Sequence, residues 1–129
     1  MKKKKILLLS DDLRMHSGVA IMSREIIFNT IQKYDWVQMG GAIRHPEAGK
    51  IIDMNSAVEE ETKIKNASLK IYPVNDYGNP HLLRQVLEIE KPDAIVHFTD
   101  PRQWIWLYNM EHEIRQNIPI MYYNIWDDL

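Results

Sequence analysis

The sequence predicts a three-layer α/β fold with a mainly parallel sheet of about five strands. Two observations predict it. Five short runs rich in apolar residues recur along the chain, and segments with helical periodicity lie between them. Strands that alternate with helices form parallel sheets, because each crossover helix packs back onto the sheet. A length of 129 residues fits a single domain over residues 1–129.

The first two predicted elements carry the clearest signals. Residues 5–9 form a continuous apolar run, which is typical of a parallel strand buried on both faces. Residues 18–33 follow as a helix, with Ser17 as its N-cap, because a serine hydroxyl can accept from the amides of the first turn. The expected buried stripe of this helix has spacings of three and four: Val19, Met22, Ile26 and Thr30, with Ile27 and Ile31 alongside.

The rest of the chain repeats the alternation. Further strands are predicted over residues 36–43, 69–74, 94–98 and 119–123, and further helices over residues 80–90 and 101–116. Residues 44–68 are polar and predict a long excursion with a short strand near Ile51. Ligands of such sheets bind beyond the carboxyl ends of the strands. The predicted ligand rim therefore comprises residues 10–18, 43–44, 99–102 and 124–128.

Composition excludes several classes of function. The chain has no cysteine, so disulfides, thiolate metal sites and a cysteine nucleophile are excluded, and a cytoplasmic location is expected. A net charge of −2 gives no reason to expect a nucleic-acid partner. The basic run Lys2–Lys5 is expected to solvate the start of the first strand. The alternative is a weak contact with an anionic membrane surface.

Most catalytic and nucleotide-binding motifs are absent. Gly49-Lys50 is followed by Ile51, so a Walker A loop is not formed, and the turn after the first strand has one glycine where a dinucleotide fingerprint has three. His112-Glu113 lacks the second histidine of a zinc protease, since Gln116 stands in its place. We therefore expect no metal and no bound cofactor.

The turn from Ser10 to Gly18 is the most informative segment. A helix that begins at Gly18 points free backbone amides at the rim, where they and the helix dipole can contact a phosphate. The alternative is that Gly18 only permits close packing at the start of the helix.

The order of segments resembles the N-terminal domain of family 4 glycosyltransferases. A lysine-led strand runs into Ser17-Gly18-Val19, the later Lys91-Pro92-Asp93 turn precedes a strand, and Ile118-Pro119 opens the last strand. The resemblance implies a Rossmann-like domain, the acceptor-side half of a GT-B enzyme that transfers a sugar from a nucleotide-sugar, retaining its configuration and without a metal. It also implies that the C-terminal donor-binding domain is absent from these 129 residues, so that the chain alone is inactive.

The resemblance assigns roles to particular residues. Ser17, Gly18 and Val19 would approach the donor phosphates, although many members have a second glycine where Ser17 stands. Asp127 or Asp128 would take the place of the His or Asp that often follows the fifth strand. Partners would be the missing domain, the nucleotide-sugar and the acceptor, while the oligomeric state stays open.

Further acceptor-side candidates on the rim have structural alternatives. They are His16, Arg44, Asp100 and Arg102. Asp100 is expected chiefly to cap a helix, and Arg102 is either an anion contact or a solvated residue at a helix start. His97 is expected to be a hydrogen-bonded core histidine. Trp104 is expected to pack in the core, whereas Trp106 and Trp126 are candidates to stack on sugars.

Two other functions compete with glycosyl transfer. Asp11-Asp12 resembles the acidic pair of a receiver domain, but the lysine that a receiver needs after its fifth strand is missing. The third reading is a non-catalytic nucleotide-binding module, which would bind nucleoside diphosphates more tightly than an acceptor domain.

Overall fold

The chain forms an α/β domain around one six-stranded sheet. This computed structural model describes residues 3–42, 44–99 and 101–124. The strands, in chain order, are β1 (Lys4–Asp11), β2 (Tyr34–Ala42), β3 (Ile52–Asp53), β4 (Leu69–Asn75), β5 (Ala94–Thr99) and β6 (Ile120–Asn124). The helices are α1 (Gly18–Thr30), α2 (Asn55–Thr62), α3 (Pro80–Glu90), the 3-10 helix η1 (Pro101–Trp104), α4 (Ile105–Asn109) and α5 (Glu111–Arg115).

The strand order is β3-β4-β2-β1-β5-β6, and every pair is parallel except β3 with β4. The five parallel strands, numbered along the chain, therefore follow the order 3-2-1-4-5 of the dinucleotide-binding folds. The expected count of about five strands is low by one, because the short β3 pairs with the edge of β4 through two residues. The strand expected near Ile51 is this β3.

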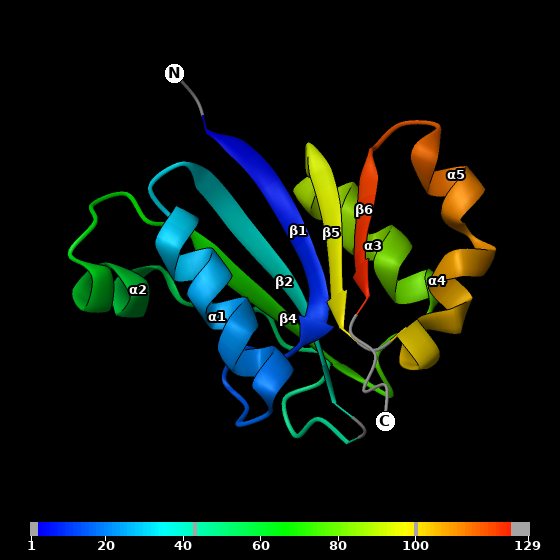
Figure 1. The fold of residues 1–129 in the computed structure, drawn as a ribbon, viewed down its shortest axis with the longest axis horizontal. Helices are drawn as coiled ribbons and strands as arrows, with labels where there is room; N and C mark the ends of the chain where they lie inside the picture. The colour runs from blue at the N-terminus through cyan, green and yellow to red at the C-terminus, as the bar shows by residue number, and fades with distance from the viewer. Residues whose placement is uncertain (1–2, 43, 100, 125–129) are drawn as a thin grey trace.

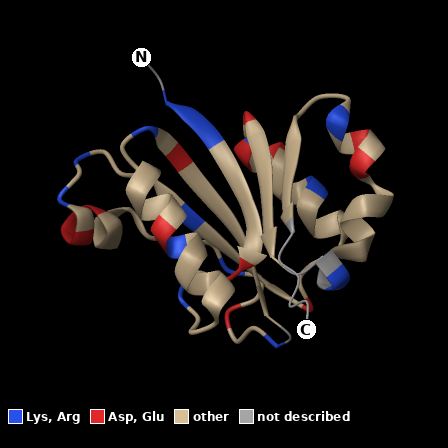
Figure 2. Cartoon of the chain, viewed as in Figure 1, with Lys and Arg blue, Asp and Glu red and all other residues tan. Residues whose placement is uncertain are grey.

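Helices cover both faces of the sheet, with α1 on the near side and α3 behind it in Figure 1. Consecutive residues of β1 point to opposite faces: Leu7 and Leu9 pack under α3, and Leu8 packs under α1. All three have no exposed surface. The apolar run predicted from the sequence thus forms a strand buried on both faces. Figure 2 shows basic and acidic residues mixed over the helices and loops.

The face that α1 buries differs from the prediction. Met22 and Ile26 are 48% and 36% exposed, whereas Ala20 and Ser23 lie fully buried beside Ile27. Small residues on the buried face let the helix axis approach the sheet closely, which the hydrophobic stripe alone does not indicate. The helix also ends at Thr30 rather than Lys33. Ser17 caps it as expected, since its Oγ accepts from the amide of Ala20 at 3.0 Å.

Two other expectations on helices are wrong. The helix expected over residues 101–116 is divided into η1, α4 and α5. The backbone leaves the α-helical conformation at Trp104, with φ −126° and ψ 30°, and at Met110, with φ −109° and ψ 9°. The excursion over residues 44–68 contains α2, which was not predicted because only Val58 of its eight residues is buried.

No helix within the described ranges is long and apolar enough to cross a membrane.

Candidate functional site

The chain passes to one face of the sheet after β1 and to the other face after β5 (Figure 1). The carboxyl ends of these two neighbouring strands therefore form the switch point of the sheet. Ligands of open α/β sheets bind at this switch point. Asp11 ends β1 here, and its carboxylate accepts hydrogen bonds from Thr99 Oγ1 at 3.2 Å and Ser17 Oγ at 2.9 Å. Asp11 therefore joins β1, β5 and the start of α1.

A pocket of about 350 Å³ opens beside Asp11. Its lining residues come from the first turn, the end of β2 and the turn after β4: Asp11, Met15, His16, Ser17, Ala42, Arg44 and Tyr77. We call it the rim pocket. Three residues predicted as site residues, His16, Ser17 and Arg44, therefore line one pocket.

The turn that carries Asp11 is held from beneath by Gln38 of β2. Gln38 is fully buried, and its Nε2 donates to Ser10 Oγ and to the Asp11 carbonyl, both at 2.7 Å. Its Oε1 accepts from the Leu13 amide at 3.1 Å. One amide side chain thus binds three points of the turn, which orders the backbone before any ligand arrives.

A buried charge cluster holds the same turn from the side. Asp12 is 1% exposed and binds the Arg14 guanidinium through both carboxylate oxygens, at 3.1 and 2.7 Å. Burial alone would raise the Asp12 pKa. The hydrogen bonds from Arg14 and His45 outweigh burial and hold that pKa below its ordinary value. Asp12 is therefore ionised at neutral pH. Arg14 also pairs with Glu47 at 2.8 Å.

His45 completes this cluster in one tautomer. The Glu47 amide donates to His45 Nδ1 at 3.1 Å, so Nδ1 carries no proton in this arrangement. The Nε2 proton then points at Asp12 Oδ2, 2.7 Å away. Both ring nitrogens are occupied and the ring is buried. His45 thus links the loop after β2 to the turn after β1 rather than acting as a free base.

Two adjacent glycines at the end of β2 make room for these contacts. A Cβ at Gly40 would lie 2.9 Å from Asp12 Cα, and a Cβ at Gly41 would lie 2.5 Å from Tyr77 Cδ1. Tyr77 itself has a φ of 62°, in the left-handed region that a bulky residue rarely adopts. Such strained residues concentrate at functional sites. Gly41 therefore lets Tyr77 take its place in the wall of the rim pocket, and Gly40 lets Asp12 pack against β2.

Of the predicted phosphate-loop residues at the start of α1, Ser17 lines the rim pocket, whereas Gly18 and Val19 do not. Ser17 satisfies the amides of Ala20 and Ile21 through its hydroxyl and its carbonyl. Among the hydrogen bonds of the described chain, none uses the amides of Gly18 or Val19. Gly18 is exposed, whereas the Val19 side chain packs against the core under α1. The Asp11 carboxylate binds the Ser17 hydroxyl at this helix start and would repel an anion, so the helix start is poorly suited to hold a phosphate unaided.

Several predicted site residues lie away from the rim pocket or outside the described residues. Arg102 is exposed in η1 and does not line the pocket. Asp100, Trp126, Asp127 and Asp128 lie outside the described residues. Within the described ranges no group of three or more metal-ligating side chains occurs.

Sequence reasoning did not single out Asp11, Asp12 and His45 as one arrangement, and it missed Tyr77. In the sequence, Asp11 and Asp12 indicate only a possible receiver pair. The doublet Gly40-Gly41 at a strand end was the signal in the sequence that other segments, here those of Asp12 and Tyr77, pack against the backbone there.

His97 lies in the core beneath α4, as expected, and is fully buried among aromatic rings. The expectation that it is hydrogen-bonded is wrong within the described chain, because neither ring nitrogen has a partner there. Burial lowers the pKa of His97 to about 4, so the ring is neutral at pH 7. Trp104 is fully buried beside it, as predicted.

Comparison with known proteins gives no relative: no family model, curated protein or solved structure matches the chain.

Proposed function

We propose that this chain is a Rossmann-like, three-layer domain on the acceptor side of a nucleotide-sugar glycosyltransferase. The observation that carries the proposal is the convergence of Asp11, His16, Ser17 and Arg44 in one pocket at the switch point of a 3-2-1-4-5 sheet. The order of short motifs along the sequence supports it independently.

The charges of the rim pocket favour an acceptor over a nucleotide. A half-exposed carboxylate accepts hydrogen bonds from the hydroxyl groups of a sugar or polyol, and it repels phosphate. In this proposal Asp11 binds an acceptor hydroxyl, while His16 and Arg44 lie where anionic parts of either substrate would be neutralised. The donor diphosphate contacts only the Gly18 and Val19 amides of this domain, and a second domain binds the nucleotide.

The competing functions fit less well. Receiver domains have the strand order 2-1-3-4-5, which differs from the order in this sheet. Their acidic pair also binds a metal, whereas Asp12 here is committed to Arg14 and His45. A nucleotide-binding module requires a phosphate site, and Asp11 opposes one.

A titration with uridine and guanosine diphosphates tests the proposal. We expect the unchanged chain to bind them with Kd values weaker than about 1 mM. Asp11→Asn removes the repelling charge, and one like-charge contact in water corresponds to about fivefold tighter binding. Asp53→Asn, on the far edge strand, makes the same charge change and should leave the affinity unaltered.

Two results would contradict the proposal. Micromolar binding of a diphosphate by the unchanged chain would favour the nucleotide-binding module. Turnover of a nucleotide-sugar by the 129-residue chain alone would contradict its assignment as half of an active site.

A further inference from the structure

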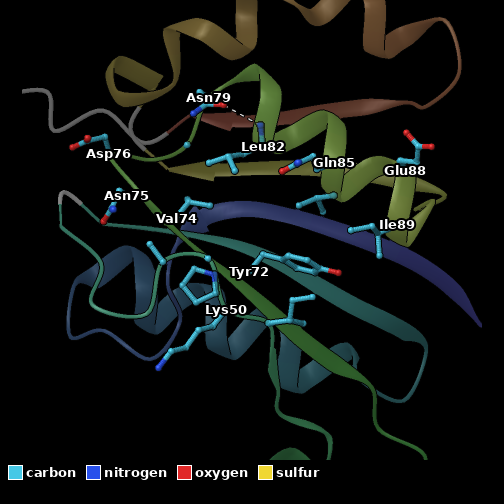
Figure 3. A pocket seen from close by; sticks show the side chains of 16 residues that line it. Lys50, Tyr72, Val74, Asn75, Asp76, Asn79, Leu82, Gln85, Glu88 and Ile89 are labelled. Carbon is cyan, nitrogen blue, oxygen red and sulfur yellow. Dashed lines mark hydrogen bonds between the residues drawn. The ribbon is translucent and has the colours of Figure 1, made fainter.

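A second and larger hollow lies on the outer side of the sheet, between α3, β4 and residues 48–51 (Figure 3). Its volume is about 1050 Å³, at the upper end of the range for small-molecule sites. It shares no lining residue with the rim pocket. The turn after β4 separates the two, since Tyr77 lines the rim pocket and its neighbours Asp76 and Gly78 line this groove.

The walls of the groove are mainly apolar. Tyr72 and Val74 of β4 face Leu82 of α3 across it (Figure 3), and Val86 of α3 also lines it. Two isoleucines form its lips, Ile51 at 55% and Ile89 at 61% exposed. A molecule with an apolar body would gain about 25 cal/mol for each Å² that it removes from water here.

The edge of β4 beside the groove is closed to an added peptide strand. Pro73 has no N–H to donate, and its carbonyl accepts from the Gly49 amide at 3.4 Å. Nearer the start of β4, Ile52 of β3 pairs with Ile71. Main-chain pairing is therefore blocked along this edge, and an occupant must bind through side-chain contacts.

One end of the groove is polar and carries both donors and acceptors. Asn79 Oδ1 accepts from the Leu82 amide at 2.9 Å, and Asn75 Oδ1 accepts from the His45 amide at 2.6 Å. Within the described ranges no hydrogen bond uses the NH₂ groups of these two side chains, so they can donate to a ligand, and the Asp76 carboxylate can accept. Hydroxyl groups satisfy both kinds of partner. Lys50 also lines the groove, but its ammonium points away from α3 (Figure 3), so a carboxylate or phosphate at this end would be repelled by Asp76. An ammonium group would leave the amide donors unpaired.

We propose that the groove binds an uncharged amphipathic molecule, with a hydroxylated head at Asn75, Asp76 and Asn79 and an aliphatic body between α3 and β4. The ten steps of 1.5 Å from Asn79 to Ile89 span about 15 Å along the helix, which sets the length of the body. This site lies outside the rim pocket, and the proposal does not depend on the glycosyltransferase assignment.

Binding of n-octyl β-D-glucoside below its micellar concentration tests the proposal. In amide chemical-shift titrations of the whole chain we expect saturable binding, with shifts confined to α3, β4 and residues 48–51. Octanoate, octylammonium and glucose, which lack one of the two features, should each bind at least fivefold more weakly. Equal binding of the charged octyl compounds, or shifts spread over the exposed apolar residues of α1, would overturn it.

Matched variants make the test specific to the groove. Ile89→Glu should weaken octyl glucoside binding about fivefold or more, because it removes an apolar lip. Ile105→Glu changes an equally exposed isoleucine of α4, at 62%, and should have no effect. Asp76→Asn is a suitable change because Asn, like Asp, tolerates the left-handed backbone at this position. It should weaken the glucoside about threefold and strengthen octanoate, because the repelling charge is lost. Unchanged affinities in Ile89→Glu, or losses of equal size in Ile89→Glu and Ile105→Glu, would overturn the site.

Discussion

At the scale of single residues, buried charge organises the rim. Asp12 is ionised with 1% of its surface exposed; Arg14 is its counterion, and His45 donates a hydrogen bond to it. A buried ion pair adds little over an apolar pair, but removing one partner leaves the others uncompensated. Asp12 therefore serves mainly to fix the positions of the turn after β1 and the loop after β2.

We predict that Asp12→Ala lowers the free energy of unfolding by about 3 kcal/mol at pH 7, measured by urea denaturation. Asp35→Ala, which removes a half-exposed carboxylate 3.9 Å from Lys3, should cost less than about 1 kcal/mol. Because the folded pKa of Asp12 is below its ordinary 3.8, its contribution is complete above that pH and is lost as the pH falls through the folded value. A difference between the two variants that persists unchanged at pH 2 would contradict this account.

His97 predicts a second dependence on pH. Its folded pKa is about 4 against an ordinary 6.5, so the neutral ring stabilises the fold fully above pH 6.5 and progressively less as the pH falls towards 4. At pH 5 the loss is about 2 kcal/mol. His97→Phe replaces a ring whose nitrogens have no partner among the described residues and should remove this loss. His81→Phe, at an exposed position of α3, is the control and should retain the dependence between pH 7.5 and 5.

At the scale of elements, two turns pack directly on the backbone of the last residues of β2. Asp12 packs over Gly40, and Tyr77 packs over Gly41. This end of the strand must therefore have no side chains on its surface, even though glycine weakens a strand interior. The rim pocket depends on this close approach as much as on any polar side chain.

Two glycine-to-alanine substitutions separate the effect of close packing on stability from the effect of losing a glycine. Gly41→Ala places a Cβ 2.5 Å from Tyr77 Cδ1 and 3.1 Å from its Cα, so the turn after β4 must shift; we expect a loss of about 1–3 kcal/mol. Gly18→Ala meets no atom within 4 Å at the start of α1 and should change stability by less than about 0.5 kcal/mol. Thermal unfolding of both variants measures the contrast, and equal effects would refute it.

At the scale of the whole molecule, stability is expected to decline from the centre of the sheet towards the β3 edge. β1 pairs with both β2 and β5 and is covered on both faces. β3 pairs through two residues, and the neighbouring α2 buries only Val58. Local opening requires less free energy where fewer apolar contacts are lost.

Native-state hydrogen exchange measures this gradient. The amides of Leu7, Leu8 and Leu9 should exchange only through global unfolding, with the full denaturant dependence. The amides of α2 should exchange through local opening at a much lower free energy and with little denaturant dependence. Equal protection in both segments would show that the β3–α2 region unfolds together with the sheet.

Much of the fold was predictable because its signals lie close together along the sequence. The apolar run of β1, the Ser17 cap and the alternation of strands and helices depend on nearest neighbours and on periodicity. The position of the ligand rim also followed, because the carboxyl ends of parallel strands lie at one edge of a sheet. These features predicted the α/β class and placed His16, Ser17 and Arg44 on the same rim.

Only the tertiary structure decided which face α1 buries, how Asp12 is paired and where the groove beside α3 lies. Met22 and Ile26 carry the hydrophobic signal, but Ala20 and Ser23 face the sheet because close approach depends on the shape of the partner surface. His45 and Asp12 are 33 positions apart. A contact of that kind arises when two strands pair. The sequence by itself therefore determined the strands, the helices α1 and α3 and the edge of the sheet where they meet, whereas α2 and the side-chain contacts at the site depend on packing between distant segments.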